Sequence, residues 1–481
     1  EICHGDPRIN ILHLKELGGL GIAYFSSADE YPQAINPYSN ERKMIYVSLK
    51  DAKLGSDRYF ATVAHELQHM IQWHVDKNED AWLNEGLSEL AVHVNGFPTN
   101  REKSYANQTD VQLTTLRQDA DVVAAHYAAA FLFTAYFRDR FGEAATQALA
   151  QRPENGIAGF AAILEELGTG LSFDDLFADW LVANYLNGAR RDAPPYNYAS
   201  VQLPGLDAQS WGRPSPTTTT VHQYGADYWQ LTGRAPVTVT FTGAQQVNTI
   251  NTAAASGRHF WLTFPADESD MHLTRRFDLR GLDKATLTFQ TWYEIEAGWD
   301  YAYVAISTDG GNTWTLLETA TATYDNPEGN SLGPGYTGNS GGGDAPVWIQ
   351  QTADLTPYVG QETLIRFQYI TDGAVHLQGF ALDDIAIPEL GYAHDAEMGS
   401  EGWQAAGFVR LTDTLPQRFL VQLILLGADA VTVERLQLDE QQQGAWTIPL
   451  GETYNKAIIV VSGITPFTQQ TAVYEIGHGA N

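Results

Sequence analysis

The chain has 481 residues and a formal net charge of −30, from 28 basic and 58 acidic side chains. Acidic groups spread along the chain repel phosphate backbones, so the charge argues against nucleic acid as a partner and suits divalent cations, calcium in particular. At roughly 150 residues per domain, this length predicts about three domains, and an apolar share of 44% supports buried cores.

Cysteine content and hydropathy exclude further classes of protein. Cys3 is the only cysteine, which excludes an intrachain disulfide and a cysteine-based zinc knuckle. No stretch reaches the roughly 18 apolar residues that span a bilayer. We therefore expect no membrane span, and the acidic composition suits a secreted, extracellular protein.

The first 190 residues mix strand and helix patterns. Short apolar runs rich in β-branched residues and tyrosine predict strands at 10–14, 21–27 and 43–49. The period then becomes helical, with Asp57 as the expected N-cap. One apolar face is marked by Phe60, Val63, Ala64, Leu67, Met70 and Ile71. Further helices are predicted at 81–94, about 119–141, 143–150, 157–167 and 172–187.

A charge pair and a double proline within 189–200 end the helical part of the chain. Beyond them, alternating apolar and polar residues predict antiparallel strands, among others at 284–295, 300–307, 363–371 and 380–387. The sequence thus predicts a multidomain protein. Its parts are an α+β domain at 1–192, a linker and β segment at 193–244 that could pair with the C-terminal sandwich, a β-sandwich at 245–390 and a C-terminal β-sandwich at 391–481.

The stretch "HELQH" carries the strongest chemical signal. His65 and His69 lie four residues apart, so on a helix both imidazoles face the same side and can hold one metal ion. Glu66 lies beside the ion and suits a general base acting on a metal-activated water. The next helix offers Glu85 as the third ligand. We expect Glu89 not to bind the metal itself but to accept the free ring N–H of a ligand histidine.

Two other interpretations of this stretch are weaker. A solvated helical hairpin could carry the same residues by chance, but an apolar helix would then bury an unpaired His-Glu-His cluster at a cost of several kcal/mol. A second geometry places the third ligand six residues after His69, where Val75 stands, and His74 misses that position by one residue. His74 and His93 lie outside the pattern and are expected at the surface.

"HELQH…WLNEGLSE" resembles the gluzincin zinc metallopeptidases, in particular hyicolysin-like and thermolysin-related catalytic domains. The resemblance implies a zincin-type domain in which His65, His69 and Glu85 bind zinc. "HYAAAFLFTAYFRDRFG" resembles the aminopeptidase helix that begins with the tyrosine polarising the scissile carbonyl. That match gives the role to Tyr127, with His126 as the alternative donor, and a packed aromatic at a helix start is the structural alternative.

The β half carries a second resemblance. "TWYEIEAGWDYAYVAISTDGGNTWT" and "LIRFQYITDGAVHLQGFALDDI" resemble the jelly-roll module of immune inhibitor A-like secreted proteins. The fold implied is antiparallel β-sandwiches, jelly-roll at 245–390 and Ig-like after it. That enzyme follows the ligand spacing rejected above, so the resemblance extends to the fold of the module and not to its third metal ligand.

The choice between endopeptidase and aminopeptidase depends on the strands before the zinc helix. Aminopeptidases carry a Gly-x-Met-Glu-Asn strand there, and no such segment occurs in residues 1–64. An open edge strand would pair with an extended protein or peptide substrate, and we expect it at Ile22, Ala23, Tyr24 and Phe25. The sequence favours an endopeptidase. An aminopeptidase and a non-enzymatic extracellular binding or adhesion protein with a peptidase-like domain remain as alternatives.

The β domains also predict ligands of their own. Acidic residues at the ends of predicted strands, in a module that resembles calcium-bearing jelly rolls, predict a structural calcium ion. The candidates are Asp267, Glu268, Asp270, Asp383 and Asp384. Five tryptophans could stack on sugars, which leaves carbohydrate or surface binding open, although sandwich cores are rich in such residues.

Overall fold

The computed structural model describes residues 8–18, 21–117, 119–187, 195–211, 216–428 and 431–480. Cys3 and the first residues of the predicted 193–244 segment lie outside these ranges. The chain divides into two compact units, one made of residues 1–84, 91–98 and 252–413, the other of residues 85–90, 99–251 and 414–481. A search of the described residues for a helix of membrane-spanning length and hydropathy finds none.

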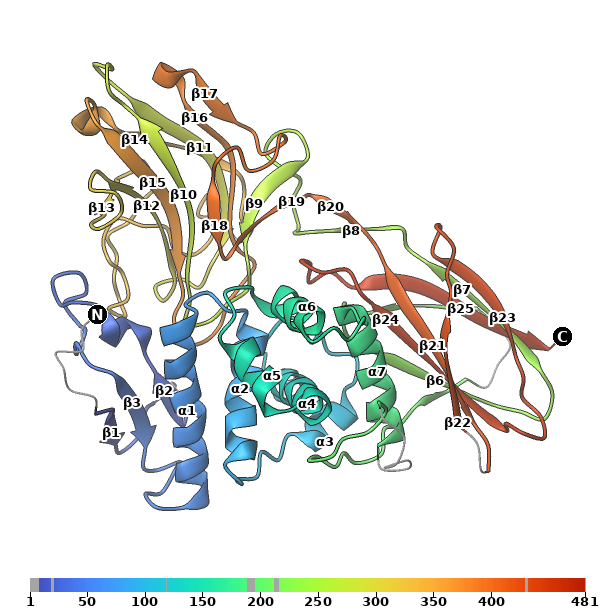
Figure 1. Ribbon diagram of the computed structural model, residues 1–481. Helices are drawn as coiled ribbons and strands as arrows, with labels where there is room; N and C mark the ends of the chain where they lie inside the picture. Colours follow the sequence, from blue (N-terminus) through green and yellow to red (C-terminus); the bar gives the residue numbers. More distant parts are fainter. Residues whose placement is uncertain are drawn as a thin grey trace. The chain divides into compact units, whose positions relative to one another are not determined.

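The first unit begins with a small sheet and a long helix. Strands β1 (Asn10–Leu14), β2 (Ala23–Phe25) and β3 (Met44–Ser48) form a three-stranded sheet in the order β1-β3-β2, so β2 is an edge strand. A short 3₁₀ turn, η1 (Ser27–Glu30), follows β2. Helix α1 (Asp57–Val75) packs on this sheet through Met70 and Trp73, which contact a core that includes Ile45 (Figure 1).

Two expectations about α1 are wrong. Its N-cap is Ser56 and not Asp57, because the Ser56 hydroxyl accepts the Tyr59 N–H at 3.2 Å. Phe60 and Ile71 were expected on the buried face, but 48% and 47% of their surfaces are exposed. The Phe60 ring stacks on that of Phe97, which gives one of the two an apolar neighbour at the surface.

The first unit also contains a two-layered β-sandwich (Figure 1). One sheet has five strands in the order β13-β12-β15-β10-β18 and the other has the order β14-β11-β16-β9-β19, with β17 beside β16. Leu273, Phe367 and Leu382 are fully buried in the core. The strands are β9 (His259–Thr263), β10 (Asp270–Asp278), β11 (Thr286–Glu294), β12 (Tyr301–Ser307), β13 (Thr315–Leu316), β14 (Ile349–Asp354), β15 (Glu362–Ile370), β16 (Gly379–Ile387), β17 (Tyr392–His394), β18 (Gln404–Ala406) and β19 (Phe408–Thr412). Short 3₁₀ turns are η2 (Thr356–Tyr358) and η3 (Pro388–Leu390).

Helix α2 (Ala81–Val94) has the predicted bounds and supplies residues to both units. The second unit holds the remaining helices, among which α4 is buried along most of its length because alanine, phenylalanine and other mostly apolar residues occupy every side of its middle. The short α3 was not predicted. The helices are α3 (Glu102–Asn107), α4 (Val123–Phe141), α5 (Glu143–Ala150), α6 (Gly156–Glu166) and α7 (Phe173–Leu186).

A second sandwich completes the second unit. Its sheets have the strand orders β22-β21-β24-β6-β4 and β23-β7-β25-β5, and β8 pairs separately with β20. Strands β5–β8 come before the first sandwich in the chain. They pair with strands from 414–480, which come after it. The strands are β4 (Gln209–Ser210), β5 (Thr217–Val221), β6 (Asp227–Thr232), β7 (Val237–Gly243), β8 (Gln246–Asn248), β20 (Thr414–Pro416), β21 (Phe419–Leu426), β22 (Val431–Leu436), β23 (Gln443–Ile448), β24 (Lys456–Gly463) and β25 (Ala472–Ala480).

Candidate metal centre

Three candidate metal ligands meet on the consecutive helices α1 and α2. His65, His69 and Glu85 each offer one ligand atom, and these atoms all lie within 4.8 Å of one another. The Nε2 atoms of the two histidines are 3.0 Å apart. Two nitrogens bound to a tetrahedral zinc at about 2.0–2.1 Å stand about 3.3 Å apart. Two imidazoles and a carboxylate at this spacing fit a zinc ion with one coordination position left open.

Asn84 fixes the ring of His69. The Asn84 Oδ1 atom lies 3.0 Å from His69 Nδ1, and a carbonyl oxygen can only accept. Nδ1 therefore carries the proton, and Nε2 keeps the lone pair that a metal needs. Asn84 was not among the residues predicted from the sequence, although its place beside Glu85 in "WLNEG" puts it within a helical turn of the ligand.

Glu66 is held between helix α1 and the edge strand β2. Its side chain is buried, and Oε2 accepts the backbone N–H of Phe25 at 3.0 Å. Three of the four residues expected in a substrate-binding edge strand, Ala23, Tyr24 and Phe25, form β2, while the carbonyl of Ile22 accepts the Ser48 N–H. The carboxylate of Glu66, the residue after His65, therefore contacts β2, the strand that we expect to bind substrate.

Tyr127 reaches Glu85 from helix α4. Its hydroxyl donates to Glu85 Oε1 at 3.1 Å. The guanidinium of Arg101 lies over the Tyr127 ring, 4.8 Å from its centroid, and donates to Glu89 Oε1 at 2.6 Å. The carboxylate of Glu89 is therefore bound to Arg101, and its assignment to a ligand histidine stays a prediction.

His126 has a different environment. It is 4% exposed, and its Nδ1 lies 3.0 Å from the carbonyl oxygen of Gln112. Burial lowers the pKa of His126 to about 4, so the ring is neutral at physiological pH. A neutral imidazole committed to a backbone carbonyl is a poorer hydrogen-bond donor to substrate than the Tyr127 hydroxyl, which already lies at a candidate metal ligand.

Gly86, next to Glu85, allows helices α2 and α4 to pack closely. A Cβ atom at this position would lie 2.9 Å from the carbonyl oxygen of Ala130 and 2.9 Å from Thr134 Cγ2. The Thr134 hydroxyl also donates to the Gly86 carbonyl at 2.9 Å. The lack of a side chain therefore serves the contact that fixes the helix carrying Glu85 against the helix carrying Tyr127.

The acidic residues predicted to bind calcium lie in several places. Glu268 Oε2 accepts the Ser27 N–H, Asp270 accepts from Gln368, and Asp383 accepts the Ser256 N–H while Asp384 accepts the Ser256 hydroxyl. Asp267 accepts from His376. Within the described ranges, the one further group of three or more side chains with metal-ligand spacing is Glu296, Asp300 and Asp372.

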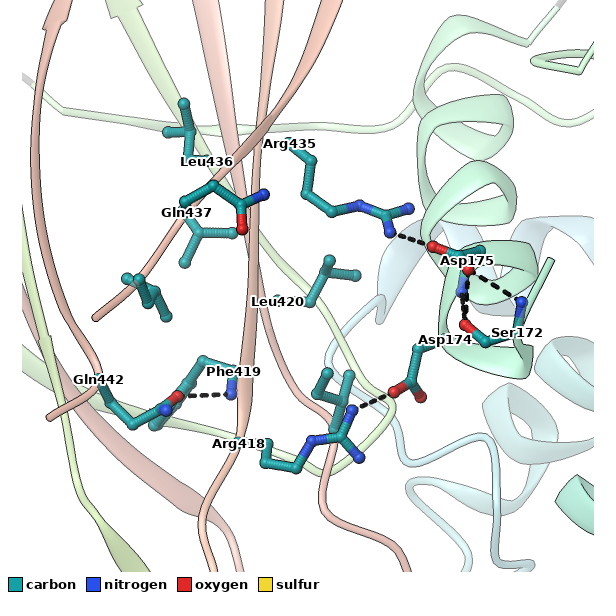
Figure 2. A pocket seen from close by; sticks show the side chains of 13 residues that line it. Ser172, Asp174, Asp175, Arg418, Phe419, Leu420, Arg435, Leu436, Gln437 and Gln442 are labelled. Carbon is teal, nitrogen blue, oxygen red and sulfur yellow. Dashed lines mark hydrogen bonds and ion pairs between the residues drawn. The ribbon is translucent and has the colours of Figure 1, made fainter. Parts of the chain in front are cut away.

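A cavity of about 350 Å³ lies in the second unit, between the start of α7 and strands β21 and β22. Its charged lining groups are paired, Asp174 with Arg418 and Asp175 with Arg435, as Figure 2 shows. Asp175 also forms a capping box with Ser172. Because these charges satisfy one another and none belongs to the metal set, the cavity has no evident part in the chemistry.

Comparison with known protein families gives a match for part of the β half of the chain. Residues 230–413 match the model of the immune inhibitor A-like MAM domain. This match confirms the resemblance to immune inhibitor A that the sequence analysis found for 245–390. It covers the first sandwich and extends back into β6–β8.

Curated relatives share part of the chain. Pre-pro-metalloprotease PrtV of Vibrio cholerae is 29% identical over 135 residues, which are 28% of this chain and 13% of that protein. Immune inhibitor A of Bacillus thuringiensis subsp. alesti is 31% identical over 161 residues, 32% of this chain and 21% of that protein. The chain thus spans about a fifth or less of the length of these relatives. The structure of infectious bursal disease virus Gx strain covers 55% of the chain at a TM-score of 0.13, too low to indicate a shared fold.

Proposed function

We propose that the chain is a secreted zinc-dependent endopeptidase of the gluzincin type. The observation that carries the proposal is the meeting of His65, His69 and Glu85 within 4.8 Å, with the buried carboxylate of Glu66 on the adjacent residue. The name of the Vibrio relative, a pre-pro-metalloprotease, supports the same class of activity. The acidic composition suits an extracellular protein.

Each residue of the centre has a separate task in this proposal. Zinc, bound by the two imidazoles and Glu85, would polarise the scissile carbonyl and make a water molecule more acidic. Glu66 takes a proton from the attacking water and passes it to the leaving amine. Tyr127 donates a hydrogen bond to the oxyanion of the tetrahedral intermediate. Asn84 and Arg101 hold the ligand and donor side chains in place.

The edge strand β2 supports endopeptidase activity. An extended peptide can add to an exposed sheet edge through its backbone, which leaves both its ends free. The hydrogen bond from the Phe25 N–H to Glu66 joins this strand to the base. A peptide on β2 would therefore lie beside the catalytic carboxylate.

The test is hydrolysis of casein, of a peptide blocked at both ends and of the same peptide with a free amino end, each with and without a zinc chelator. We expect activity that chelation abolishes and zinc restores. Glu66→Gln should bind zinc normally and lose about 10²–10⁴-fold in turnover, while Glu452→Gln in an exposed turn, the same chemical change, should behave like the wild type. Near-full turnover in Glu66→Gln would exclude the proposed mechanism.

The same assay separates the alternatives. An aminopeptidase would cleave only the peptide with a free amino end. A non-enzymatic binding protein with a peptidase-like domain would cleave neither peptide while still binding zinc. Carbohydrate or surface binding by the β domains is a further prediction, which a glycan array would test.

A further inference from the structure

The loop that connects α3 to α4 is buried, although its described part, 108–117, contains no helix or strand. Val111, Gln112, Leu113 and Leu116 are each 5% exposed or less. Buried backbone groups need hydrogen-bond partners, and a loop cannot provide them internally as a helix does. The partners must therefore come from another part of the chain.

The turn between β5 and β6, residues 222–226 of the second sandwich, provides them. The Leu113 N–H donates to the Tyr224 carbonyl at 3.2 Å, and the Ala226 N–H donates to the Thr109 carbonyl at 3.1 Å. The Thr109 hydroxyl also donates to the Ala226 carbonyl at 2.9 Å. These hydrogen bonds hold 109–113 against the second sandwich at both ends of the segment.

Side chains make this contact close and specific. Asp110 accepts the His222 N–H at 2.7 Å. A Cβ atom at Gly225 would lie 2.8 Å from Asp110 Oδ1 and 3.2 Å from the Val111 nitrogen, so the absence of a side chain permits the approach. Tyr224 has a φ of 51°, which a residue with a side chain keeps only where its surroundings fix it. The two segments therefore have little freedom to move apart.

Gln112 connects this contact to helix α4. Its Nε2 donates to the carbonyl of Thr468, between β24 and β25, at 3.0 Å. Its own carbonyl oxygen lies 3.0 Å from His126 Nδ1, and because a carbonyl can only accept, the ring donates through Nδ1. His126 is the fourth residue of α4 and precedes Tyr127. We call the contacts from residues 222–226 and Thr468, through Gln112, to His126 the α4 anchor.

We propose that His126 is a positioning residue for Tyr127 and that the second sandwich holds it in place through Gln112. The inference rests on the proposed peptidase function. Tyr127 must lie within hydrogen-bond distance of the oxyanion, and a displacement of about 1 Å costs about 10²-fold in rate. The His126 ring is 4% exposed and bonded to Gln112, so it acts through its neighbour and not on the substrate. The second sandwich then has a part in catalysis and is not a separate binding module.

The first experiment compares two substitutions of His126 by steady-state kinetics. His126→Ala removes the ring and its N–H, so kcat should fall about tenfold or more, with KM and zinc content unchanged. His126→Asn keeps an N–H near the Nδ1 position and should restore most of the lost kcat. An equal loss of kcat in both variants would overturn the role of the bond to Gln112.

A double variant distinguishes positioning from direct donation to the oxyanion. If His126 acts through Tyr127, His126→Ala combined with Tyr127→Phe should have a kcat within about twofold of Tyr127→Phe alone. The reason is that the placement of a hydroxyl that has been removed no longer matters. If the two losses multiply instead, the ring contributes independently of Tyr127, and the proposal is overturned.

Gly225→Ala tests the second sandwich itself. The added methyl group would press on Asp110 and Val111, so kcat should fall while KM stays unchanged, as in His126→Ala. Gly451→Ala in the same sandwich is the matched control, because a Cβ atom there meets nothing within 4 Å, and it should behave like the wild type. An unchanged kcat in Gly225→Ala would overturn the part assigned to the second sandwich.

Hydrogen exchange keeps the α4 anchor separate from the peptidase proposal. Peptides covering 109–116 and 123–130 should exchange faster in His126→Ala than in the wild type, because the start of α4 loses its bond to the loop. A wild type that hydrolyses no peptide would refute the proposed function and, with it, the role of the α4 anchor in catalysis. An active wild type with unchanged exchange in His126→Ala would overturn the α4 anchor alone.

Discussion

The carboxylate of Glu66 accepts the backbone N–H of Phe25 at 3.0 Å, so the proposed base is anchored to the strand proposed to bind substrate. This contact gives Glu66 a structural task as well as a chemical one. Substitutions at this position can separate the two.

Glu66→Gln retains an oxygen that can accept the Phe25 N–H, whereas Glu66→Ala leaves that buried donor without a partner. We expect Glu66→Gln to unfold near the wild-type Tm. For Glu66→Ala we expect the free energy of unfolding to fall by about 1–3 kcal/mol. Thermal unfolding of the three zinc-loaded proteins measures the Tm and urea denaturation measures the free energy of unfolding. Equal losses in the two variants would show that the contact to Phe25 does not contribute.

Tyr127→Phe should lower kcat by about 10²-fold with little change in KM, because a transition-state hydrogen bond is lost. The Tyr127 hydroxyl also donates to Glu85, so a purely positioning role would instead weaken zinc binding. Steady-state kinetics together with a zinc competition assay distinguish the two. Tyr38→Phe, an exposed tyrosine, is the matched control, and full activity of Tyr127→Phe would remove this residue from the mechanism.

Asn84→Ala should weaken zinc binding by about 10–100-fold, because the ring of His69 loses the acceptor that fixes its tautomer. Asn84→Asp keeps an acceptor at the same place and should bind zinc at least as well as the wild type. Competition with a chromophoric chelator measures both affinities. Equal affinities in all three proteins would show that Asn84 does not orient the ligand.

The group of Glu296, Asp300 and Asp372, whose carboxylate oxygens lie within 4.8 Å of one another, should make stability depend on pH. Burial and neighbouring charges raise the pKa of Glu296 and that of Asp372 to about 7 in the folded chain. The folded state therefore holds more protons than the unfolded state between about pH 4.5 and 7. In that window the calcium-free protein should lose stability as the pH rises.

A calcium ion bound at this group, the structural ion that the sequence predicts, would offset the repulsion that appears when these carboxylates ionise. The rise in Tm on adding calcium should therefore be larger at pH 8 than at pH 5.5. Scanning calorimetry at the two pH values, with and without calcium, measures the difference. A larger calcium effect at the acidic pH would contradict the assignment of the ion to these carboxylates.

The sequence predicted the parts of the centre that lie close together in the chain. His65, Glu66 and His69 follow from helical spacing, and Glu85 from the next helix, so local periodicity was enough to group them. The sequence did not predict correctly which side of α1 is buried. Phe60 and Ile71 follow the apolar period of the helix but are exposed. The apolar period identifies one face of a helix, but it does not show which other elements pack against that face.

The group of Glu296, Asp300 and Asp372 shows where local patterns fail. Glu296 and Asp372 are distant in the chain, and only the register that pairs Tyr301 with Ile370 brings their segments together. That register depends on the whole sheet, which no short motif encodes. The short helix α3 was missed for a related reason, because six residues are too few to display a period.

The most direct test is the metal content of the purified chain, measured by elemental analysis after dialysis against metal-free buffer. The account predicts about one zinc per chain in the wild type and in Glu66→Gln, and a large loss of zinc in His69→Ala and Glu85→Ala with the fold retained by circular dichroism. A wild-type protein that binds no zinc when zinc is supplied, or a His69→Ala variant that binds it equally well, would contradict the central claim.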